Sequence, residues 1–307
     1  EFVDNKYSND NAKKDITKYF DEKVFEYSKP ISLIHKIAEI STNSNDIILD
    51  FFAGSGTTGD AIMQLNTDDC GKRSFILIQI PEPINPKKNK AAYDFVKDEL
   101  KAEPTIFEIT KERLVRAAKS SKETITAKIK ANEKEIKSLN GKLDLEDKDE
   151  KINQLQSEIK NLKEQDLGFK IIKTTPIWED YDFEATELDN QTKLFDEDKL
   201  TEGDIKALLT TWKTYDGIVL TQKKKKIDLS GYTAYYGKGK LYLMNKGFTT
   251  DNLKNLLEKI DSDKKFNPTS IITFGYHFES KNLRELSENV KSYANKKNID
   301  IDFITRY

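Results

Sequence analysis

Residues 50–59 read DFFAGSGTTG, and this stretch decides the fold of the first part of the chain. The apolar residues Ile47, Ile48 and Leu49 stand directly before it, which is the pattern of a buried parallel strand. The sequence AIMQL follows at 61–65 and has the composition of the first turns of a helix. The stretch therefore predicts a strand, a glycine-rich loop and a helix in succession.

The predicted loop suits a nucleotide-like cofactor. Backbone N–H groups and the positive end of the helix dipole would face one ligand, and Gly54 and Gly56 would let the backbone approach it without an intervening Cβ. The spacing Gly54-x-Gly56-x-x-Gly59 also fits the dinucleotide-binding fingerprint and nearly fits a P-loop. A P-loop has lysine after its last glycine, where this chain has Asp60, and Asp50 at the strand end would repel a pyrophosphate. Asp50 suits an ammonium group instead.

The spacing Asp50-x-Phe52-x-Gly54-x-Gly56 resembles the S-adenosylmethionine-binding motif of DNA amino-methyltransferases. In that family the acid meets the methionine ammonium, and the glycine loop wraps the amino-acid end of the cofactor. The resemblance therefore implies that S-adenosylmethionine is the cofactor. It assigns the cofactor contacts to the strand end and the loop, at Asp50, Phe52, Ala53, Gly54, Ser55, Gly56 and Thr57.

The sequence on either side extends the resemblance. Upstream, Tyr27-Ser28-Lys29-Pro30 resembles the Lys-Pro motif that precedes the cofactor motif in methyltransferases with a permuted motif order, which implies that Lys29 and Pro30 belong to the site. Downstream, the similarity continues through TIFEITKERLVRAA at 105–118. The modification (Mod) subunit of type III restriction-modification systems shows the closest resemblance.

The second strand of the motif set departs from the family pattern. SFILIQIPE, at 74–82, resembles the strand whose C-terminal residue meets the ribose hydroxyls of the cofactor. Many relatives carry a carboxylate at that position, whereas this chain has Gln79. An amide hydrogen-bonds hydroxyls more weakly than a charged acceptor does. Gln79 is the expected ribose contact, and Glu82 is the substitute.

A further family motif, Asp/Asn/Ser-Pro-Pro-aromatic, holds the flipped base, and this chain has no Pro-Pro pair. In the permuted order, that motif and the target-recognition domain come before the Lys-Pro segment. We therefore expect the C-terminal portion of a site-specific DNA adenine-N6 methyltransferase, inactive alone. The resemblance also implies that the parent protein binds DNA and the restriction subunit and forms a homodimer.

The composition of the 307 residues limits the function classes. The 51 basic and 53 acidic residues give a net charge of −2, so any DNA contact should be local. A single cysteine, Cys70, and two histidines, His35 and His277, provide no cluster with metal-ligand spacing. No apolar run approaches the roughly 20 residues of a membrane span, and no signal peptide precedes Glu1, so we expect a cytoplasmic protein without a membrane partner.

Beyond the cofactor motif, the chain changes character twice. Apolar heptads at 129–143 and 152–162 are out of register by two positions, which predicts an antiparallel hairpin of helices, roughly 115–143 and 148–166. From residue 168 we expect strands at 169–173, 217–222, 232–236 and 241–245, followed by helix 251–260, strand 270–274, helix 282–296 and strand 300–304.

The predicted fold is α/β throughout. It comprises an incomplete Rossmann-like parallel sheet at 1–118, a coiled-coil-like hairpin at 119–166 and a second small α/β domain at 167–307. In the first part, residues 1–26 are a polar lead-in, Pro30 is the first residue of a helix through Ser41, and strands are expected at 75–80 and 105–109, with a helix at 91–100 between them.

Two other function classes fit parts of the sequence. A nicotinamide-dependent oxidoreductase fits the glycine spacing but would have an acid about 20 residues beyond the loop, where Gln79 stands. A non-enzymatic dimerisation module fits residues 119–307, which contain no glycine loop and no paired catalytic set. Titration with S-adenosylmethionine and NAD distinguishes these readings.

Overall fold

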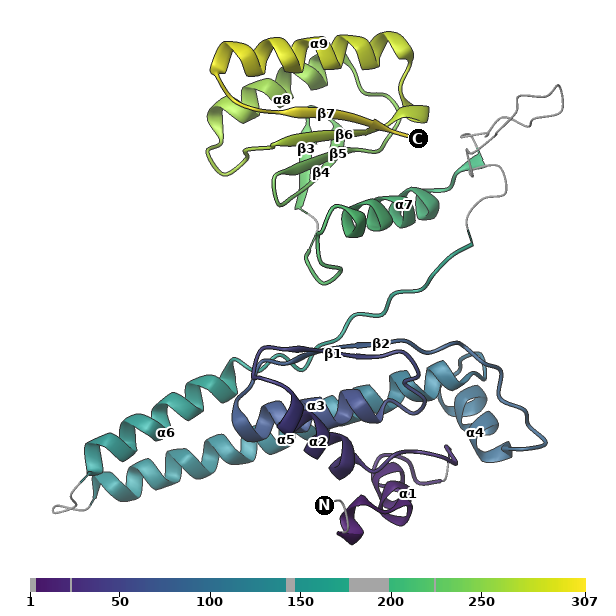
Figure 1. Ribbon diagram of the computed structural model, residues 1–307, viewed down its shortest axis with the longest axis vertical. Coiled ribbons are helices and arrows are strands. Elements are labelled where there is room, and N and C mark those ends of the chain that lie inside the picture. Colours follow the sequence, from purple (N-terminus) through teal and green to yellow (C-terminus); the bar gives the residue numbers. More distant parts are fainter. Residues whose placement is uncertain (1–3, 23, 142–146, 177–198, 224) are drawn as a thin grey trace. The chain divides into compact units, whose positions relative to one another are not determined.

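The computed structural model describes residues 4–22, 24–141, 147–176, 199–223 and 225–307. The chain divides into two compact units, Glu1–Phe169 and Lys170–Tyr307 (Figure 1). Both units are mixed α/β, the first with a small parallel sheet and the second with a mixed sheet.

The described residues of the first unit form two strands and are otherwise mostly helical. In chain order the elements are η1 (Asn5–Tyr7), α1 (Asn9–Thr17), α2 (Ile31–Ser41), β1 (Ile47–Asp50), α3 (Thr57–Asp69), β2 (Ser74–Leu77), α4 (Lys90–Asp94), the π-helical turn η2 (Phe95–Glu99), α5 (Ile106–Asn140) and α6 (Lys148–Lys163).

The first sheet is the strand–loop–helix–strand unit that the glycine motif predicts. β1 and β2 pair in parallel, with Ile47 opposite Ser74 and Asp50 opposite Leu77, and α3 is the crossover between them. Most of α3 is buried, because it packs against α2, α5 and one face of the sheet. This arrangement fixes the loop between β1 and α3 at the C-terminal end of β1.

The other face of this small sheet is apolar and uncovered within the first unit. The large side chains that alternate along β1 and β2 and beyond their ends are all more than half exposed, namely Ile47, Leu49, Phe51, Ile76, Ile78 and Ile80. Parallel sheets normally bury both faces. Within the described part of this unit, only one face has its helical layer.

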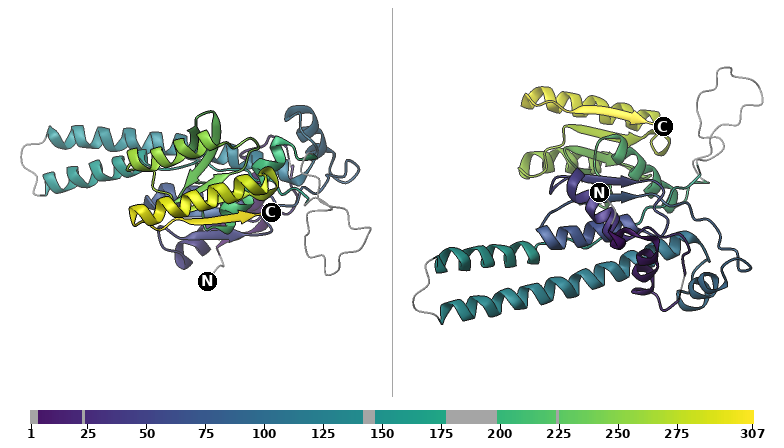
Figure 2. Two further views of the ribbon diagram at one scale, coloured as in Figure 1. Left: turned by 90° about the horizontal axis from the view of Figure 1, so that it is seen from above. Right: turned by 60° about the horizontal axis from the view of Figure 1, so that its bottom comes forward.

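The predicted hairpin is present, with a longer first helix. α5 and α6 lie side by side in both views of Figure 2, and an ion pair of 2.8 Å joins Lys151 to Glu135 across them. The described heptad residues of both helices are buried or half-buried, and Leu139 and Leu162 are the most enclosed of the heptad residues on their respective helices. Their seams therefore pack within the hairpin. Leu143, the last heptad residue of the first helix, lies outside the described residues.

The second unit has three layers, with one sheet between helices. Its elements are α7 (Glu202–Tyr215), β3 (Lys225–Leu229), β4 (Tyr232–Gly237), β5 (Lys240–Leu243), α8 (Thr250–Ser262), β6 (Ser270–Phe274), η4 (Gly275–His277), α9 (Ser280–Lys297) and β7 (Asp302–Arg306). The strand order is β3-β4-β5-β6-β7, antiparallel up to β5 and parallel from β5 to β7. The predicted β-α-β-α-β run is confirmed.

Alternation along the central strands explains the two helical layers. Leu241, Leu243 and Ile271 belong to a core that includes α8 and α9, whereas Tyr242 and Ile272 belong to a core that includes α7. Every residue of β6 is buried, as expected for a strand with a neighbour on each side and a helical layer on each face. Figure 1 shows α8 and α9 on the face of the sheet opposite α7.

Several predicted elements are wrong. Residues 105–109 form no strand, because α5 begins at Ile106 and Thr105 makes only an isolated bridge to Pro83. No strand forms at 169–173 or 217–222, and β3 starts only at Lys225. The N-terminal segment is more than a lead-in, since its apolar residues Ile16 and Phe20 are almost fully buried in the first core.

Candidate functional site

Two left-handed glycines form the loop between β1 and α3. Gly54 has a φ of +52° and Gly56 a φ of +81°, a region of backbone space that favours glycine. Gly56 is the N-cap of α3, and its N–H donates to the Ala53 carbonyl at 2.7 Å, which closes a tight turn. The shape of the loop therefore depends on these two glycines.

The carboxylate of Asp50 is fixed by donors from the loop and from α3. Its Oδ1 accepts from the Phe52 N–H at 3.0 Å, and its Oδ2 accepts from the Thr58 hydroxyl at 2.6 Å. Each carboxylate oxygen has a second lone pair for a further donor. The side chain is half-buried and lines a hollow, so a cationic ligand in that hollow can approach it.

Gln79 reaches the glycine loop from the segment after β2. Its Oε1 accepts from the Gly54 N–H at 2.7 Å, and its Nε2 donates to the Ile80 carbonyl at 2.9 Å. A backbone hydrogen bond also joins the loop to this segment, because the Ala53 N–H donates to the Ile78 carbonyl at 3.1 Å. The structure thus brings Gln79 and the loop together over 25 residues of sequence.

The Lys-Pro segment lies against the same loop through its backbone. The Thr57 hydroxyl donates to the Lys29 carbonyl at 3.4 Å, while the Lys29 side chain is exposed. Pro30 is buried. The sequence predicts it as the first helical residue of α2, but the structure places it one position earlier, as the N-cap. Its extended backbone still lets the helix begin at Ile31.

A fully buried arginine underlies the loop. Arg113, on α5, donates from Nη1 to the hydroxyls of Ser28, Ser55 and Thr57 at 3.1, 2.8 and 2.8 Å. Its Nε and Nη2 donate to Oδ2 of Asp60, on α3, at 3.2 and 3.1 Å. One guanidinium thereby joins the Lys-Pro segment, the glycine loop, α3 and α5.

Asp60 carries the balancing charge of this cluster. Its second oxygen accepts from the Tyr19 hydroxyl at 3.1 Å and from Gln64 at 2.8 Å. Burial raises the pKa of the Asp60 carboxyl, while Arg113 and these donors act in the opposite direction. Asp60 stands where a P-loop would have a lysine, and in this structure it helps to support the glycine loop.

Thr110 also supports the loop from α5. Its hydroxyl contacts the Gly54 carbonyl and the Ile106 carbonyl, and its methyl group lies against Gly56. Thr110 and Arg113 are three residues apart, so they share one face of the helix. The first turns of α5 therefore form the floor beneath the glycine loop.

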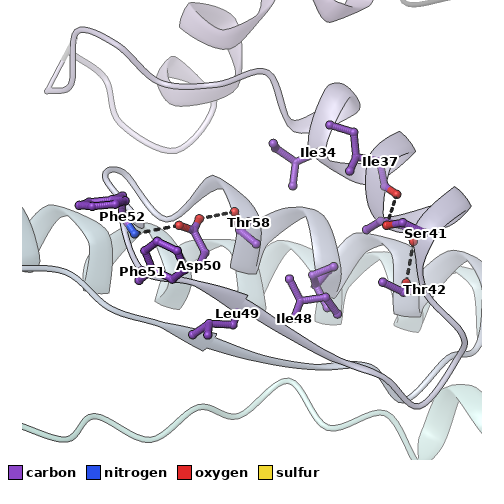
Figure 3. A pocket seen from close by; sticks show the side chains of 12 residues that line it. Ile34, Ile37, Ser41, Thr42, Ile48, Leu49, Asp50, Phe51, Phe52 and Thr58 are labelled. Carbon is purple, nitrogen blue, oxygen red and sulfur yellow. Dashed lines mark hydrogen bonds between the residues drawn. The ribbon is translucent and has the colours of Figure 1, made fainter.

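A hollow of about 280 Å³ opens beside β1, between α2, the loop and α3. Figure 3 shows Ile34 and Ile37 on one side, Ile48 and Leu49 on the other, and Asp50 with its two hydrogen bonds at one end. The lining is mostly apolar, and the Asp50 carboxylate is its one charged group. An apolar wall with one fixed polar group is typical of a small-molecule site.

The predicted site residues do not all face this hollow. Asp50 and Phe52 line it, and the Phe52 ring is 81% exposed. The side chains of Ser55 and Thr57 are buried instead against Arg113. Lys29 and Gln79 are joined to the loop by the hydrogen bonds above, whereas Pro30 is buried at the start of α2. Glu82, the substitute for Gln79, is exposed.

Sequence reasoning missed Thr58, Asp60, Thr110 and Arg113 as parts of the site. Thr58 follows the glycine motif directly, and the i, i+3 spacing of Thr110 and Arg113 is visible once 106–118 is taken as helix. The pairing of Arg113 with Asp60 spans 53 residues, and no local pattern indicates it.

The described ranges contain neither a membrane-spanning helix nor a metal-binding cluster. No helix there combines the length and apolar composition needed to cross a bilayer. In the same residues, no three His, Cys, Asp or Glu side chains are grouped so as to hold a metal ion.

Two family models match different parts of the chain. One, described as a DNA methylase, matches residues 2–87, which include β1, the glycine loop, α3 and β2. The other, described as the type III R-M EcoP15I C-terminal domain, matches residues 203–299 of the second unit.

Individual relatives match nearly the whole chain. It is 38% identical over 300 residues to the type III restriction-modification enzyme EcoPI Mod subunit of Escherichia phage P1, covering 98% of this chain and 40% of that protein. It is 34% identical to the EcoP15I Mod subunit of Escherichia coli, with 92% and 36% covered, and 31% identical to the StyLTI Mod subunit of Salmonella typhimurium, with 97% and 43% covered. The chain thus spans about two fifths of the length of these curated relatives.

Proposed function

This chain is a homologue of the Mod subunits of type III restriction-modification enzymes, and we propose that it supplies the S-adenosylmethionine site of a DNA adenine-N6 methyltransferase. The observation that carries the proposal is the glycine loop with the Asp50 carboxylate fixed beside it, inside the segment matched by the DNA methylase family. The parent protein is the modification subunit of a type III system.

The described residues fit the two ends of this cofactor. Asp50 accepts from the methionine ammonium, and the loop from Phe52 to Thr57 surrounds the amino-acid end. Gln79 contacts the ribose hydroxyls, with Lys29 and Pro30 closing the site from the α2 side. When bound, the cofactor supplies an electrophilic methyl group. The protein's part is to orient that group and to exclude water from it.

The remaining sheet of the methyltransferase domain belongs beside β1. The hollow runs along this strand, whose second edge is unpaired among the described strands, and the uncovered sheet face carries Leu49 and Ile76. An unpaired edge and an apolar face are both unfavourable in water, so they favour a covering segment. We assign this cover to the part of a Mod subunit that carries the acceptor site, completing a Rossmann-like sheet.

The other partners follow from the same proposal. DNA and the restriction subunit bind the parent protein, which is a cytoplasmic homodimer. Within the chain, the proposal divides 1–118, 119–166 and 167–307 into the cofactor part, the hairpin and a C-terminal α/β domain. The hairpin and the C-terminal domain serve assembly.

Asp50 provides the direct test of cofactor binding. In Asp50→Ala, the affinity for S-adenosylmethionine measured by calorimetry should fall by roughly 1.5–3 kcal/mol, the range for a hydrogen bond to a charged group. Asp46→Ala is the matched control, because Asp46 is also half-buried and accepts a backbone N–H, from Asn43 at 2.7 Å, but lies before β1. Equal affinity in Asp50→Ala and the parent, or preference for NAD, removes the proposal.

The chain alone should not methylate DNA. Transfer needs the adenine amino nitrogen held in line with the methyl group, and no described residue has that role. Incubation with duplex DNA and radiolabelled S-adenosylmethionine should give no labelled adenine, whereas adding a polypeptide with the Pro-Pro motif in trans should restore transfer. Turnover by the 307-residue chain alone, free of full-length enzyme, contradicts the division of labour proposed here.

A further inference from the structure

Arg113 is used in an unusual way for a buried ion pair. Its side chain is fully buried, and Asp60 neutralises it through Nε and Nη2. Burial of a charged pair is costly, and a nearby carboxylate would be sufficient to offset the charge. Yet Nη1 is directed away from Asp60, toward the hydroxyls of Ser55 and Thr57 in the glycine loop and of Ser28 in the Lys-Pro segment.

The three hydroxyls also contact one another. Ser28 lies 3.0 Å from Ser55 and 3.2 Å from Thr57, and the Ser55 and Thr57 hydroxyls are 3.2 Å apart. Because a hydroxyl turns to suit its neighbours, such a triangle has several arrangements of similar energy. The two Nη1 protons of Arg113 reduce this number, because an oxygen that accepts from the guanidinium must turn its own proton toward another acceptor. The cluster is thereby ordered by a single donor group.

The loop has two sides with different surroundings. The side chains of Phe52 and Thr58 line the hollow, whereas those of Ser55 and Thr57 are buried against Arg113. A group that holds the buried side fixes the backbone that the other side presents. Since α5 also carries Thr110 against Gly54, the loop is held by one face of one helix.

We propose that Arg113 is a positioning residue for the amino-acid end of the cofactor: it holds the glycine loop and the Lys-Pro segment in the geometry that this part of the ligand requires. The inference rests on the proposed function, since it concerns the same site. Arg113 does not touch the hollow, so its effect is transmitted through Ser55 and Thr57. The adenosine end of the ligand should depend on it much less.

A pair of ligands separates positioning from general damage. S-adenosylhomocysteine carries the amino-acid group, and 5′-methylthioadenosine has the same adenosine without it. In Arg113→Lys, one ammonium replaces three donor nitrogens and cannot serve both Asp60 and the loop. The calorimetric affinity for S-adenosylhomocysteine should fall about tenfold or more, while that for 5′-methylthioadenosine should change by less than about threefold.

Matched variants control for the loss of a buried arginine. Arg73 is also buried, donating to Asp69 at 2.7 Å and to Thr42 at 2.9 Å, and Arg73→Lys should leave the ratio of the two affinities unchanged. If Arg113→Lys does not fold, Ser55→Ala keeps the charge pair and removes one loop contact of Arg113. It should shift the ratio in the same direction by a smaller factor.

A measurement without ligand keeps this inference separate from the proposed function. Amide hydrogen exchange of the loop peptide containing Gly54 and Gly56 should accelerate in Arg113→Lys and not in Arg73→Lys. A parent chain that binds neither ligand overturns the proposed function. A parent chain that binds both, with an unchanged affinity ratio and unchanged loop exchange in Arg113→Lys, overturns the role of Arg113.

Discussion

Replacing Gly56 by alanine should strain the glycine loop by an amount that the geometry sets. Gly56 has φ +81° and ψ 22°, a left-handed conformation that costs other residues about 1–2 kcal/mol. An ideal Cβ there would lie 3.2 Å from the methyl carbon of Thr110, which is closer than an ordinary contact. That crowding adds up to about 1 kcal/mol, the low end of the cost of overpacking a core.

Gly56→Ala should therefore lower the free energy of unfolding by about 1–3 kcal/mol if the loop keeps its shape. If the loop relaxes instead, the same free energy appears as a loss of S-adenosylhomocysteine affinity, roughly fivefold to a hundredfold. The added Cβ points at α5 and not into the hollow, so the loss is due to loop geometry and not to a blocked ligand. Hydrogen exchange of α3 peptides gives the stability, and calorimetry gives the affinity.

Two further variants divide the penalty into its parts. Thr110→Ser removes the methyl group and keeps the hydroxyl that contacts Gly54, so in the Gly56→Ala background it should recover only the contact part. Gly247→Ala has the strain without the contact, because Gly247 has φ +83° and an ideal Cβ there meets no atom within 4 Å. Unchanged stability and affinity in Gly56→Ala, or no recovery with Thr110→Ser, refutes this account of the loop.

Three other predictions concern the second unit and assembly. Burial alone raises the pKa of Asp216, but the Arg306 guanidinium and neighbouring donors outweigh burial and hold this pKa below its ordinary value. The ionised Asp216 therefore adds stability that is present above about pH 4 and is lost as the pH falls through the folded-state pKa. In urea unfolding, Asp216→Asn should be less stable than the parent at pH 7, and its stability should decline less below about pH 4. Asn252→Ala should lower the free energy of unfolding by about 2–4 kcal/mol, because it removes a buried amide that caps α8 and donates to a β3 carbonyl. In the same unfolding assay, Asn289→Ala should lower it by less than about 0.5 kcal/mol, because Asn289 is exposed. Light scattering should show self-association of the chain, and a strict monomer at tens of micromolar, on the order of weak interface affinities, would contradict it.

Local chemistry made the centre of the site predictable. Ile47, Ile48 and Leu49 before two closely spaced glycines indicate a strand, a loop and a helix within some twenty residues, and each signal acts over only a few residues. The same holds for β6, whose sequence SIITF is rich in β-branched and aromatic side chains and whose five residues are all buried. At these places the residues that decide the structure are neighbours in the sequence.

Predictions failed where tertiary packing decides. Residues 105–109 are rich in β-branched and aromatic side chains and favour a strand, yet Ile109, Leu114 and Ala117 are buried in the first core from one helix. The run after Gly217 also favours a strand, but only Ile218 of its apolar residues is buried, and Val219 is 56% exposed. Without a second strand to pair with, β propensity alone does not form a strand.

The sequence-based prediction of the site was also incomplete because tertiary contacts decide which residues meet. Asp60 was read only as an argument against a P-loop, because its partner Arg113 is far away in sequence and looks like any charged helix residue. A buried arginine cannot be distinguished from an exposed one by its type alone. Only the fold shows which of the many lysines and arginines of this polar chain has no contact with water.

The length of α5 gives the molecule a mechanical property. This one helix carries Thr110 and Arg113 beneath the glycine loop and, at its other end, the hairpin. At 1.5 Å per residue, Arg113 and Asn140 are about 40 Å apart along a single rod. A helix resists compression and bending far more than a loop does, so a force on the end of α5 that packs against α6 would be carried along the same helix to the residues beneath the glycine loop.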